Sequence, residues 1–392
     1  MKIMSINTGS SSLKFSLFEI ENKELIASGL FEKVTIPGSF YTIKYNGEKI
    51  YEEVEMPNHT VAVKILLDRL VSKGIIDSLD EIGAIGHRLV HGADKYKSSV
   101  IITDEVVEDL KRFSDLAPLH NPANILGIEA VREVLPNVPM VGVFDTAFHQ
   151  TMEESTYMYP VPLSWYKEHK IRKYGFHGTS HCYISKQIPN LIGKTDYKAI
   201  ICHLGSGGSL SAVENGKCID TSMGFTPLPG IMMGTRCGDI DPSIITYIAK
   251  KENKTAEEVV NDLNKKSGFL GLSEKYSDFR DIYAGVEAGD ANCKLAFDKY
   301  VKTVVNYIAM YYVELGGADI ICFTAGLGEN AIPVRKAIAE KLACLGVKLD
   351  EEKNNTRGET IQISTSDSKI SLFVVPTNEE LMIAEDTYEL IK

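Results

Sequence analysis

Short apolar runs that end in small or polar residues recur along the chain, and they predict strands followed by loops. The first run, at 3–6, breaks into a turn of small residues and resumes at 15–18. Further apolar runs without regular alternation are typical of buried strands, and they lie at 138–144, 320–323 and 372–375. Helical spacing separates them, over 61–73 before Gly74, and from the pair Asn121-Pro122, read as N-cap and first turn, to about Leu135. We therefore expect an α/β fold with ligands at the strand ends.

The first apolar run returns later in the chain, which predicts an internal duplication. The run Ile200-Ile201-Cys202-His203-Leu204-Gly205-Ser206 matches Met4-Ser5-Ile6-Asn7-Thr8-Gly9-Ser10, with Gly205 in the place of Gly9. Each copy continues into a two-residue hairpin signal, Asn46-Gly47 in the first and Asn215-Gly216 in the second.

A chain of 392 residues is also longer than one hydrophobic core usually supports. We expect one repeat in each of two domains, 1–150 and 151–379, with a C-terminal helix at about 380–392 packing back on the first.

Composition narrows the classes of function. A net charge of −11 argues against nucleic acid or an anionic membrane as the main partner. Seven cysteines, an odd number without metal-ligand spacing, favour free thiols in a reducing cytoplasm. The chain shows no secretory signal, and no run approaches the roughly 18 apolar residues of a membrane helix.

Three glycine-rich turns follow predicted strands, and each has the chemistry to hold phosphate through backbone N–H groups. They are Gly9-Ser10-Ser11-Ser12 with Lys14 nearby, Gly205-Ser206-Gly207-Gly208, and Gly326-Leu327-Gly328-Glu329-Asn330. A single such turn is more often just a tight turn, but three favour a nucleotide site. The segment Gly193-Lys194-Thr195 resembles the end of a Walker A nucleotide-binding motif, but Ile188 stands where that motif requires its first glycine. The GxGxxG fingerprint of a dinucleotide site does not follow any predicted strand either.

Several long polar segments resemble those of the acetate/propionate kinase family, and they extend from residue 3 to about residue 385. The segments are Asn7 to Lys14, Gly86-His87-Arg88-Leu89-Val90-His91-Gly92, Pro118-Leu119-His120-Asn121-Pro122, Phe144-Asp145-Thr146-Ala147-Phe148-His149, Tyr174 to His181, Met233-Gly234-Thr235-Arg236, Phe323-Thr324-Ala325-Gly326 and Pro376-Thr377-Asn378-Glu379-Glu380.

The resemblance implies a duplicated actin/Hsp70-like (ribonuclease H-like) fold with an interdomain nucleotide cleft. It implies reversible transfer of the γ-phosphate of ATP to acetate, giving acetyl phosphate and ADP. Mg²⁺ is the expected cofactor, with Mn²⁺ as a substitute, and the protein is expected to be a homodimer.

The resemblance also assigns catalytic roles. Arg88 and Arg236 would clamp the charge of the phosphoryl group, because a guanidinium is planar and always charged. His177 would donate to the moving phosphoryl group, and Asp145 would orient other groups, since acetate needs no general base. His120 would lie near the site.

Binding residues are assigned in the same way. Magnesium is expected at Asn7 and Glu379, with Glu380 as the alternative carboxylate. Acetate would occupy an apolar cup of Val90, Leu119, Phe176 and Pro227, with Arg88 at its carboxylate. Nucleotide and phosphate contacts are expected from Ser10, Ser12, Lys14, His203, Leu204, Gly205, Ser206, Gly207, Asp278, Phe279, Arg280, Gly326, Leu327, Gly328, Glu329 and Asn330. Ser206 departs from the family's usual asparagine, so its phosphate contact would run through water.

Three alternatives stay open at this stage. A propionate kinase would share every motif and differ only in its preferred acid. An ATPase module of the Hsp70 or actin type would need a peptide-binding or polymerising part. A sugar kinase would need polar groups to bind hydroxyls, which the predicted apolar cup does not contain.

Overall fold

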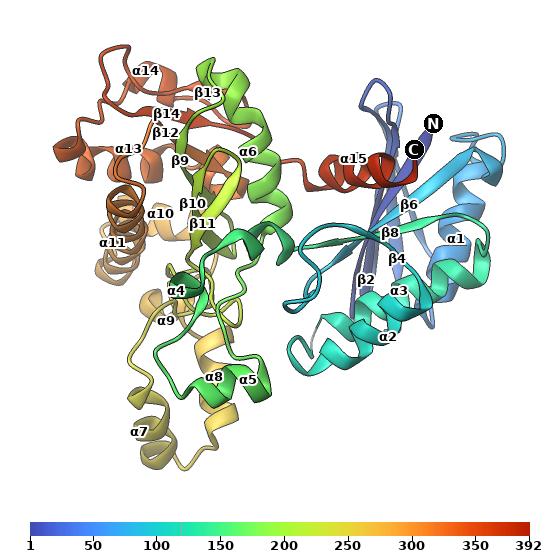
Figure 1. Ribbon diagram of the computed structural model, residues 1–392, viewed down its shortest axis with the longest axis horizontal. Helices are drawn as coiled ribbons and strands as arrows, with labels where there is room; N and C mark the ends of the chain where they lie inside the picture. The colour runs from blue at the N-terminus through green and yellow to red at the C-terminus, as the bar shows by residue number, and fades with distance from the viewer. Residues whose placement is uncertain (119) are drawn as a thin grey trace. The chain divides into compact units, whose positions relative to one another are not determined.

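The computed structural model describes residues 1–118 and 120–392 (Figure 1). The chain forms two compact units. The first unit is Met1–Gln150 together with Asn378–Lys392, and the second unit is Thr151–Thr377. None of the helices in these described residues is both long enough and apolar enough to cross a membrane.

The first unit is built on an eight-stranded sheet in the order β5-β4-β3-β2-β1-β6-β8-β7. Its strands are β1 (Lys2–Gly9), β2 (Ser12–Glu19), β3 (Glu24–Glu32), β4 (Phe40–Tyr45), β5 (Glu48–Glu53), β6 (Ile82–Leu89), β7 (Val100–Ile101) and β8 (Met140–Phe144). Its helices are α1 (His59–Ser72), α2 (Asp104–Arg112), α3 (Asn121–Val134) and α15 (Glu379–Ile391).

Both faces of this sheet are covered by helices. Along β8, Met140 and Phe144 belong to the large core that includes residues of α1, α2 and α3. The alternate residues Val141 and Val143 pack instead with Ile383 of α15. Successive side chains of a strand point to opposite faces, so α15 covers the face away from α1 and α3, as Figure 1 shows.

The second unit has a six-stranded sheet in the order β11-β10-β9-β12-β14-β13. Its strands are β9 (Lys198–Leu204), β10 (Gly208–Glu214), β11 (Lys217–Thr221), β12 (Ile320–Thr324), β13 (Ile361–Gln362) and β14 (Ser371–Val374). Its helices are α4 (Glu154–Tyr157), α5 (Leu163–His169), α6 (Gly178–Ile192), α7 (Ser243–Glu252), α8 (Ala256–Lys265), α9 (Gly268–Ser273), α10 (Phe279–Glu287), α11 (Ala291–Glu314), α12 (Ala325–Asn330), α13 (Ile332–Lys341) and α14 (Glu351–Asn354).

The two sheets repeat one pattern of strand pairing. In the first unit β3, β2 and β1 are antiparallel neighbours, and β6 and β8 continue the sheet in parallel. In the second unit β11, β10 and β9 are antiparallel, and β12 and β14 continue in parallel. An antiparallel edge strand, β7 or β13, completes each sheet on the parallel side. The duplicated α/β fold predicted from the repeated run is therefore confirmed.

The two Asn-Gly hairpins are also confirmed. Asn46 and Gly47 have φ of +48° and +78° between β4 and β5, and Asn215 and Gly216 have φ of +50° and +83° between β10 and β11. Both central residues of each turn are therefore left-handed, which matches the right-handed twist of the strands they join.

Two local predictions were wrong. The segment from Ala325 to Asn330 is the short helix α12 rather than a glycine turn. Gly328 makes this possible, since a Cβ there would lie 3.1 Å from the backbone carbon of Phe323, so helix and strand pack closely. Asn121 is the first residue of α3 rather than its N-cap, and its side chain instead bonds the backbone N–H and C=O of His91 at 3.3 and 3.1 Å.

The contact of α15 with β6 depends on Gly86, and we expect Gly86→Ala to destabilise the protein by about 1–3 kcal/mol. A Cβ there would lie 2.3 Å from Thr387 Oγ1, 2.5 Å from Ile383 Cγ2 and 3.2 Å from the Ile383 carbonyl oxygen, which cannot rotate away. Urea unfolding would measure the loss. In the matched change Gly83→Ala on the same strand, the Cβ would meet mainly the flexible end of Met1, at 2.7 Å. Equal stability losses in the two variants would contradict this account.

Candidate active site

A bidentate ion pair lies at the ends of the parallel strands of the first unit. Arg88 lies near the end of β6, and Asp145 follows β8 directly. Arg88 Nη2 donates to Asp145 Oδ2 at 2.6 Å and Nε donates to Oδ1 at 3.2 Å. The Asp145 side chain is 2% exposed while that of Arg88 is 24% exposed. The carboxylate fixes the guanidinium and raises its pKa, and the exposed part of Arg88 is left to meet a ligand.

Two asparagines of α3 shape the chain that follows Arg88. Asn124 accepts from the Val90 N–H at 3.1 Å and donates to the Thr8 carbonyl, also at 3.1 Å. It therefore links the end of β6 to the end of β1. Asn121 holds His91 in the same way, so the segment that carries Arg88 and Val90 is fixed by side chains.

A small hollow beside this pair contains the predicted metal residues. Its lining includes Asn7, Lys14, Arg88, Glu379 and Glu380. Lys14 forms an ion pair with Glu380. Burial raises the pKa of Glu379 to about 7, the nearby Asp145 and Glu380 charges add to the rise, and Arg88 and Lys14 oppose it. Glu379 is therefore poised to bind either a proton or a cation near neutral pH.

In the second unit, the turn between β9 and β10 is flanked by two candidate catalytic side chains. A Cβ added to Gly207 would lie 3.4 Å from Arg236 Nη1 and 3.7 Å from both Cε1 and Nε2 of His177. The guanidinium and the imidazole edge thus face the same point of the turn. Arg236 Nη1 also donates to the Pro227 carbonyl at 3.2 Å, and burial lowers the pKa of Arg236.

His177 belongs to a group of stacked and bonded side chains. It is the N-cap residue of α6 and has a left-handed backbone, with φ of +57°. Its ring stacks on that of His203, with centroids 4.2 Å apart and planes 19° from parallel. His203 Nδ1 contacts Ser180 Oγ at 2.8 Å, and Ser180 Oγ contacts Thr377 Oγ1 at 2.8 Å.

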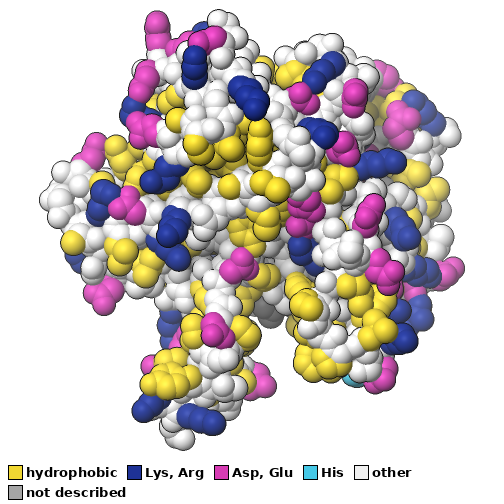
Figure 2. Space-filling model, turned by 60° about the vertical axis from the view of Figure 1, so that its left-hand side comes forward, with side chains coloured by type: hydrophobic (Ala, Val, Ile, Leu, Met, Phe, Trp, Pro, Cys, Tyr) yellow, Lys and Arg dark blue, Asp and Glu magenta, His cyan; other side chains and the backbone are white. Residues whose placement is uncertain are grey.

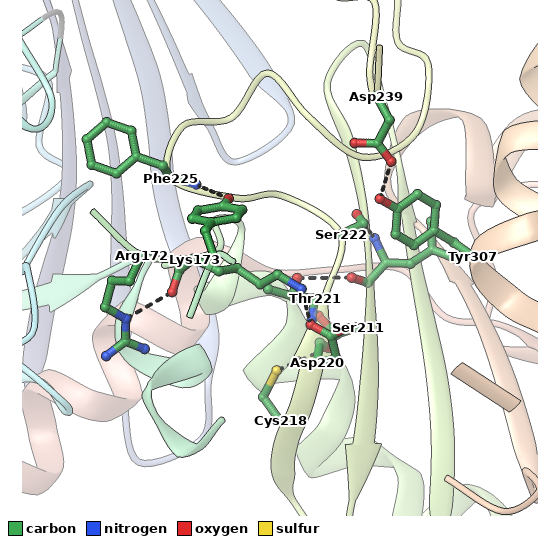
Figure 3. A network of polar contacts seen from close by, with 12 residues as sticks. Arg172, Lys173, Ser211, Cys218, Asp220, Thr221, Ser222, Phe225, Asp239 and Tyr307 are labelled. Atoms are coloured by element: carbon green, nitrogen blue, oxygen red, sulfur yellow. Dashed lines mark hydrogen bonds and ion pairs between the residues drawn. The ribbon is translucent and has the colours of Figure 1, made fainter. Parts of the chain in front are cut away.

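Arg236 is carried on a long loop whose base is tied twice to Asp239. The Gly230 N–H donates to Asp239 Oδ1 at 2.8 Å, and the Asp239 N–H donates back to the Gly230 carbonyl at 3.0 Å. Tyr307 of α11 donates to Asp239 Oδ2 at 2.5 Å, as Figure 3 shows. These bonds make a closed base for the loop and so limit the positions that Arg236 can take.

The segment that leads to His177 is tied to the end of β11. Lys173 pairs with Asp220 at 2.6 Å, in the centre of Figure 3. The N–H groups of Tyr174 and Gly175 both donate to the Gly224 carbonyl, at 3.1 and 3.2 Å. The chain therefore enters α6 from a fixed direction.

A cavity of about 630 Å³ opens beside the same turn, entirely within the second unit. Its lining includes the predicted residues Gly205, Ser206, Asp278, Phe279, Arg280, Gly326, Leu327 and Asn330. It also includes residues that were not predicted, namely Gly234, Phe269, Ser277, Tyr283, Ala331, Ile332, Pro333 and Arg357. The volume and the largely apolar walls suit a planar base and its sugar.

Arg335 explains how the distant Arg357 reaches this cavity. Its side chain is fully buried, and it donates to the Gly328 carbonyl at 3.0 Å and to the carbonyls of Asn354 and Thr356 at 2.7 and 2.8 Å. These hydrogen bonds hold the segment 354–356, which precedes Arg357, next to α12. Nothing in the local sequence marks Arg335 as such a link, because it bonds backbone carbonyls and the Oδ1 atom of Asn354, 19 residues away.

The remaining predicted residues are placed as follows. Gly328 packs on β12, and Glu329 accepts the Thr377 N–H at 3.1 Å. His203 and Leu204 are buried in β9. Ser10 is exposed in the turn before β2, and Ser12 is the first residue of β2. His120 is exposed and directly precedes α3. Val90 is buried in the first unit, while Phe176 is buried and Pro227 half-buried in the second. Leu119 lies outside the described residues, and the apolar cup stays a prediction.

Residues 2–385 match the profile of the acetokinase family. The chain belongs to this family. The predicted resemblance is confirmed, and membership of the acetokinase family makes the protein a phosphotransferase.

Individual members of the acetokinase family show the same likeness. An acetate kinase of Clostridium novyi is 52% identical over 396 aligned residues, which cover 100% of this chain and 99% of the relative. The crystal structure of an acetate kinase from Porphyromonas gingivalis is 42% identical with a TM-score of 0.96, and that of a propionate kinase from Francisella tularensis is 41% identical with a TM-score of 0.94. Both structures are matched over 100% of each chain.

Proposed function

We propose that the protein is an acetate kinase, which transfers the γ-phosphate of ATP to acetate and forms acetyl phosphate and ADP. The observation that carries the proposal is the arrangement in the second unit. A cavity of nucleotide size ends at a glycine turn, and that turn is flanked by Arg236 and His177. A base in the cavity would direct its phosphates along the turn toward these two donors.

The residues supply position and charge, which is what phosphoryl transfer requires. The charge of the moving group spreads over its equatorial oxygens, and Arg236, His177 and the N–H groups of the turn would stabilise it. Arg88 would bind the carboxylate of acetate, and Asp145 would hold Arg88 in its fork. No general base is needed, because acetate is already ionised at neutral pH.

Propionate is the second candidate acid, favoured by the likeness to the Francisella propionate kinase. We propose that Val90, Leu119, Phe176 and Pro227 bind the methyl group and select by size. An apolar pocket discriminates one methylene by about 1–3 kcal/mol, so propionate should react with a specificity constant roughly 10- to 200-fold lower. Steady-state ADP release with each acid measures this ratio, with a blank that lacks acid. Equal or higher kcat/KM for propionate would assign the chain to propionate instead.

We also propose Mg²⁺ as the cofactor, with Mn²⁺ as a substitute. Asn7 and Glu379 provide the hard oxygens that Mg²⁺ prefers, and both line the same hollow, where Lys14 pairs with Glu380. Among the described residues no group of three or more His, Cys, Asp or Glu forms a metal cage. That fits an ion held by one or two protein oxygens and by phosphate, whose charge it would neutralise.

The raised pKa of Glu379 gives a pH-dependent stability that can be measured. Its folded pKa of about 7 exceeds the ordinary 4.5, so its stabilising contribution is complete below about pH 4.5 and is lost as the pH rises through 7. Glu379→Gln removes this loss. Without Mg²⁺, we expect the variant to gain about 1–3 kcal/mol relative to the parent between pH 5 and pH 8 in urea unfolding.

The neighbouring change Glu380→Gln is the control for this experiment. It breaks the ion pair with Lys14 and removes one of the charges that raise the pKa of Glu379, so we expect a smaller gain between pH 5 and pH 8 than for Glu379→Gln. A Glu379→Gln variant whose stability relative to the parent is the same at pH 5 and pH 8 would refute the interpretation.

We further propose that the protein works in the cytoplasm as a homodimer and binds neither nucleic acid nor membrane. Cys202, Cys237, Cys293, Cys322 and Cys344 are free thiols, which suits a reducing compartment. Cationic and anionic side chains are interspersed on the face shown in Figure 2, which does not favour a polyanionic partner there. Several large apolar side chains of the second unit are exposed, among them Tyr247 at 62% and Ile244 at 42%, and a second copy could cover them. Light scattering would show whether the protein is a dimer in solution.

A further inference from the structure

A serine on β10 stands between two histidines of α6. Ser209 is paired in register with His203 across β9 and β10, so their side chains lie on the same face of the sheet. The first turn of α6 covers this face and brings His177 and His181 to it, four residues apart and hence one helical turn apart. Ser209 and His181 are both fully buried.

The hydroxyl of Ser209 contacts both rings. Its Oγ lies 2.9 Å from Nδ1 of His177 and 2.8 Å from Nε2 of His181. Both distances are those of good hydrogen bonds. Within the part of the chain that the structure describes, Oγ has no third partner.

This geometry limits where the protons can be. A serine hydroxyl has one hydrogen, and a buried O–H without an acceptor is costly. If both rings donated to Oγ, the hydroxyl hydrogen would have no acceptor. Ser209 therefore donates to one ring and accepts from the other.

The position of Arg236 indicates which ring receives the hydrogen. Arg236 Nη1 and the Nε2 edge of His177 flank the same point of the Gly207 turn. A guanidinium nearby disfavours a second cation, which favours the neutral form of His177 with a single ring proton. For Nε2 to donate to a phosphoryl oxygen, that proton must be on Nε2, and Nδ1 must then accept from Ser209.

We propose that Ser209 and His181 form a relay that sets the tautomer of His177. His181 Nε2–H donates to Ser209 Oγ, Ser209 O–H donates to His177 Nδ1, and His177 presents Nε2–H to the Gly207 turn. Ser209 and His181 are then positioning residues, and the inference rests on the proposed role of His177 in phosphoryl transfer. This relay is distinct from the stack of His177 on His203, which orients the ring plane and leaves its proton unassigned.

Kinetics of Ser209→Ala test the relay. We expect kcat to fall about 10- to 100-fold, as for other groups that orient an active side chain, with KM for ATP and acetate changed less than about threefold. The matched control is Ser211→Ala, two residues along β10 and equally buried, whose hydroxyl bonds Thr221 (Figure 3). We expect kcat of the control to stay within about threefold of the parent. Retention of near-normal kcat by Ser209→Ala, or an equal fall in both variants, would overturn the proposal.

Replacement of His181 separates the hydrogen bond from the packing. Gln has an N–H that can replace the ring Nε2–H, whereas Phe has a ring of similar size and no donor. We expect His181→Gln to keep more of kcat than His181→Phe. The reverse order would contradict a relay and favour a purely structural role for the ring.

Nitrogen-15 NMR of labelled histidine reads the tautomer in the substrate-free protein. The His177 signals are assigned by their loss in His177→Gln. We expect the parent to carry the proton on Nε2 with a bare Nδ1, and Ser209→Ala to shift toward the other tautomer. A proton on Nδ1 of His177 in the parent overturns the relay. Because this spectrum needs no turnover, it separates failure of the relay from failure of the proposed function, which would show as absence of acyl phosphate in the parent.

Discussion

We expect Arg236→Ala to lower kcat by about a thousandfold or more, as loss of an arginine does at other phosphoryl-transfer sites. Arg236 Nη1 faces the Gly207 turn together with His177. Its guanidinium is half-buried, so its charge is weakly screened and acts strongly on a phosphoryl group placed there. The loop from Gly230 to Asp239 is closed at its base, and its sequence holds no other Lys or Arg that could take the place of Arg236.

Two further variants sharpen this test. Arg236→Lys keeps the charge without the fork, and we expect a smaller but still large loss of kcat because lysine cannot bind two oxygens in one plane. Arg112→Ala removes an exposed arginine of α2 and should leave kcat within about threefold of the parent. Steady-state ADP release and urea unfolding would be measured for all three. Near-normal turnover of a folded Arg236→Ala would show that Arg236 does not stabilise the transferred group.

The second large effect is expected for Arg88→Ala, with a loss of kcat again of about a thousandfold or more. This variant should also unfold more easily, by about 3 kcal/mol, because it leaves the carboxylate of Asp145 buried without its cation. We expect KM for acetate to rise as well, since Arg88 is proposed to bind the substrate carboxylate. The loss of kcat reports the missing guanidinium in catalysis and is measured by steady-state ADP release. The loss of stability reports the unpaired Asp145 and is measured by urea unfolding.

Lys95→Ala separates stability from catalysis in the same unit. Asp109 is also fully buried, and it pairs with Lys95 and Arg112 and accepts from Tyr96 at 2.5 Å. Loss of Lys95 should destabilise the first unit while kcat stays within about threefold of the parent. If Lys95→Ala and Arg88→Ala lowered kcat alike, the effect of Arg88 would be one of folding rather than of catalysis.

Much of the fold was predictable because it depends on local patterns. The repeated run before Gly9 and Gly205 marks the first strand of each duplicated sheet, and Asn46-Gly47 and Asn215-Gly216 favour the left-handed turns that they form here. The segment after Thr324 was wrongly predicted as a turn, because two glycines in four residues disfavour a helix. Close packing of Gly328 on β12 outweighs that preference and makes a helix.

The candidate site was predictable only where its residues lie in recognisable segments. The cavity lining contains several predicted residues, but Arg357 was missed because Arg335 brings its segment to α12 through backbone carbonyls. A functional link for His181 was not predicted from the sequence. Its link to His177 runs through Ser209, which belongs to a different strand, and no pattern in the sequence connects the two.

The most direct test of the central claim is the identity and amount of the product. Purified protein is incubated with Mg·ATP, acetate and hydroxylamine, and the acetohydroxamate and ADP formed are measured together. We predict equal molar amounts of the two, both dependent on acetate, because each transferred phosphoryl group yields one acyl phosphate. ADP formation without hydroxamate at saturating acetate would contradict phosphoryl transfer to the carboxylate.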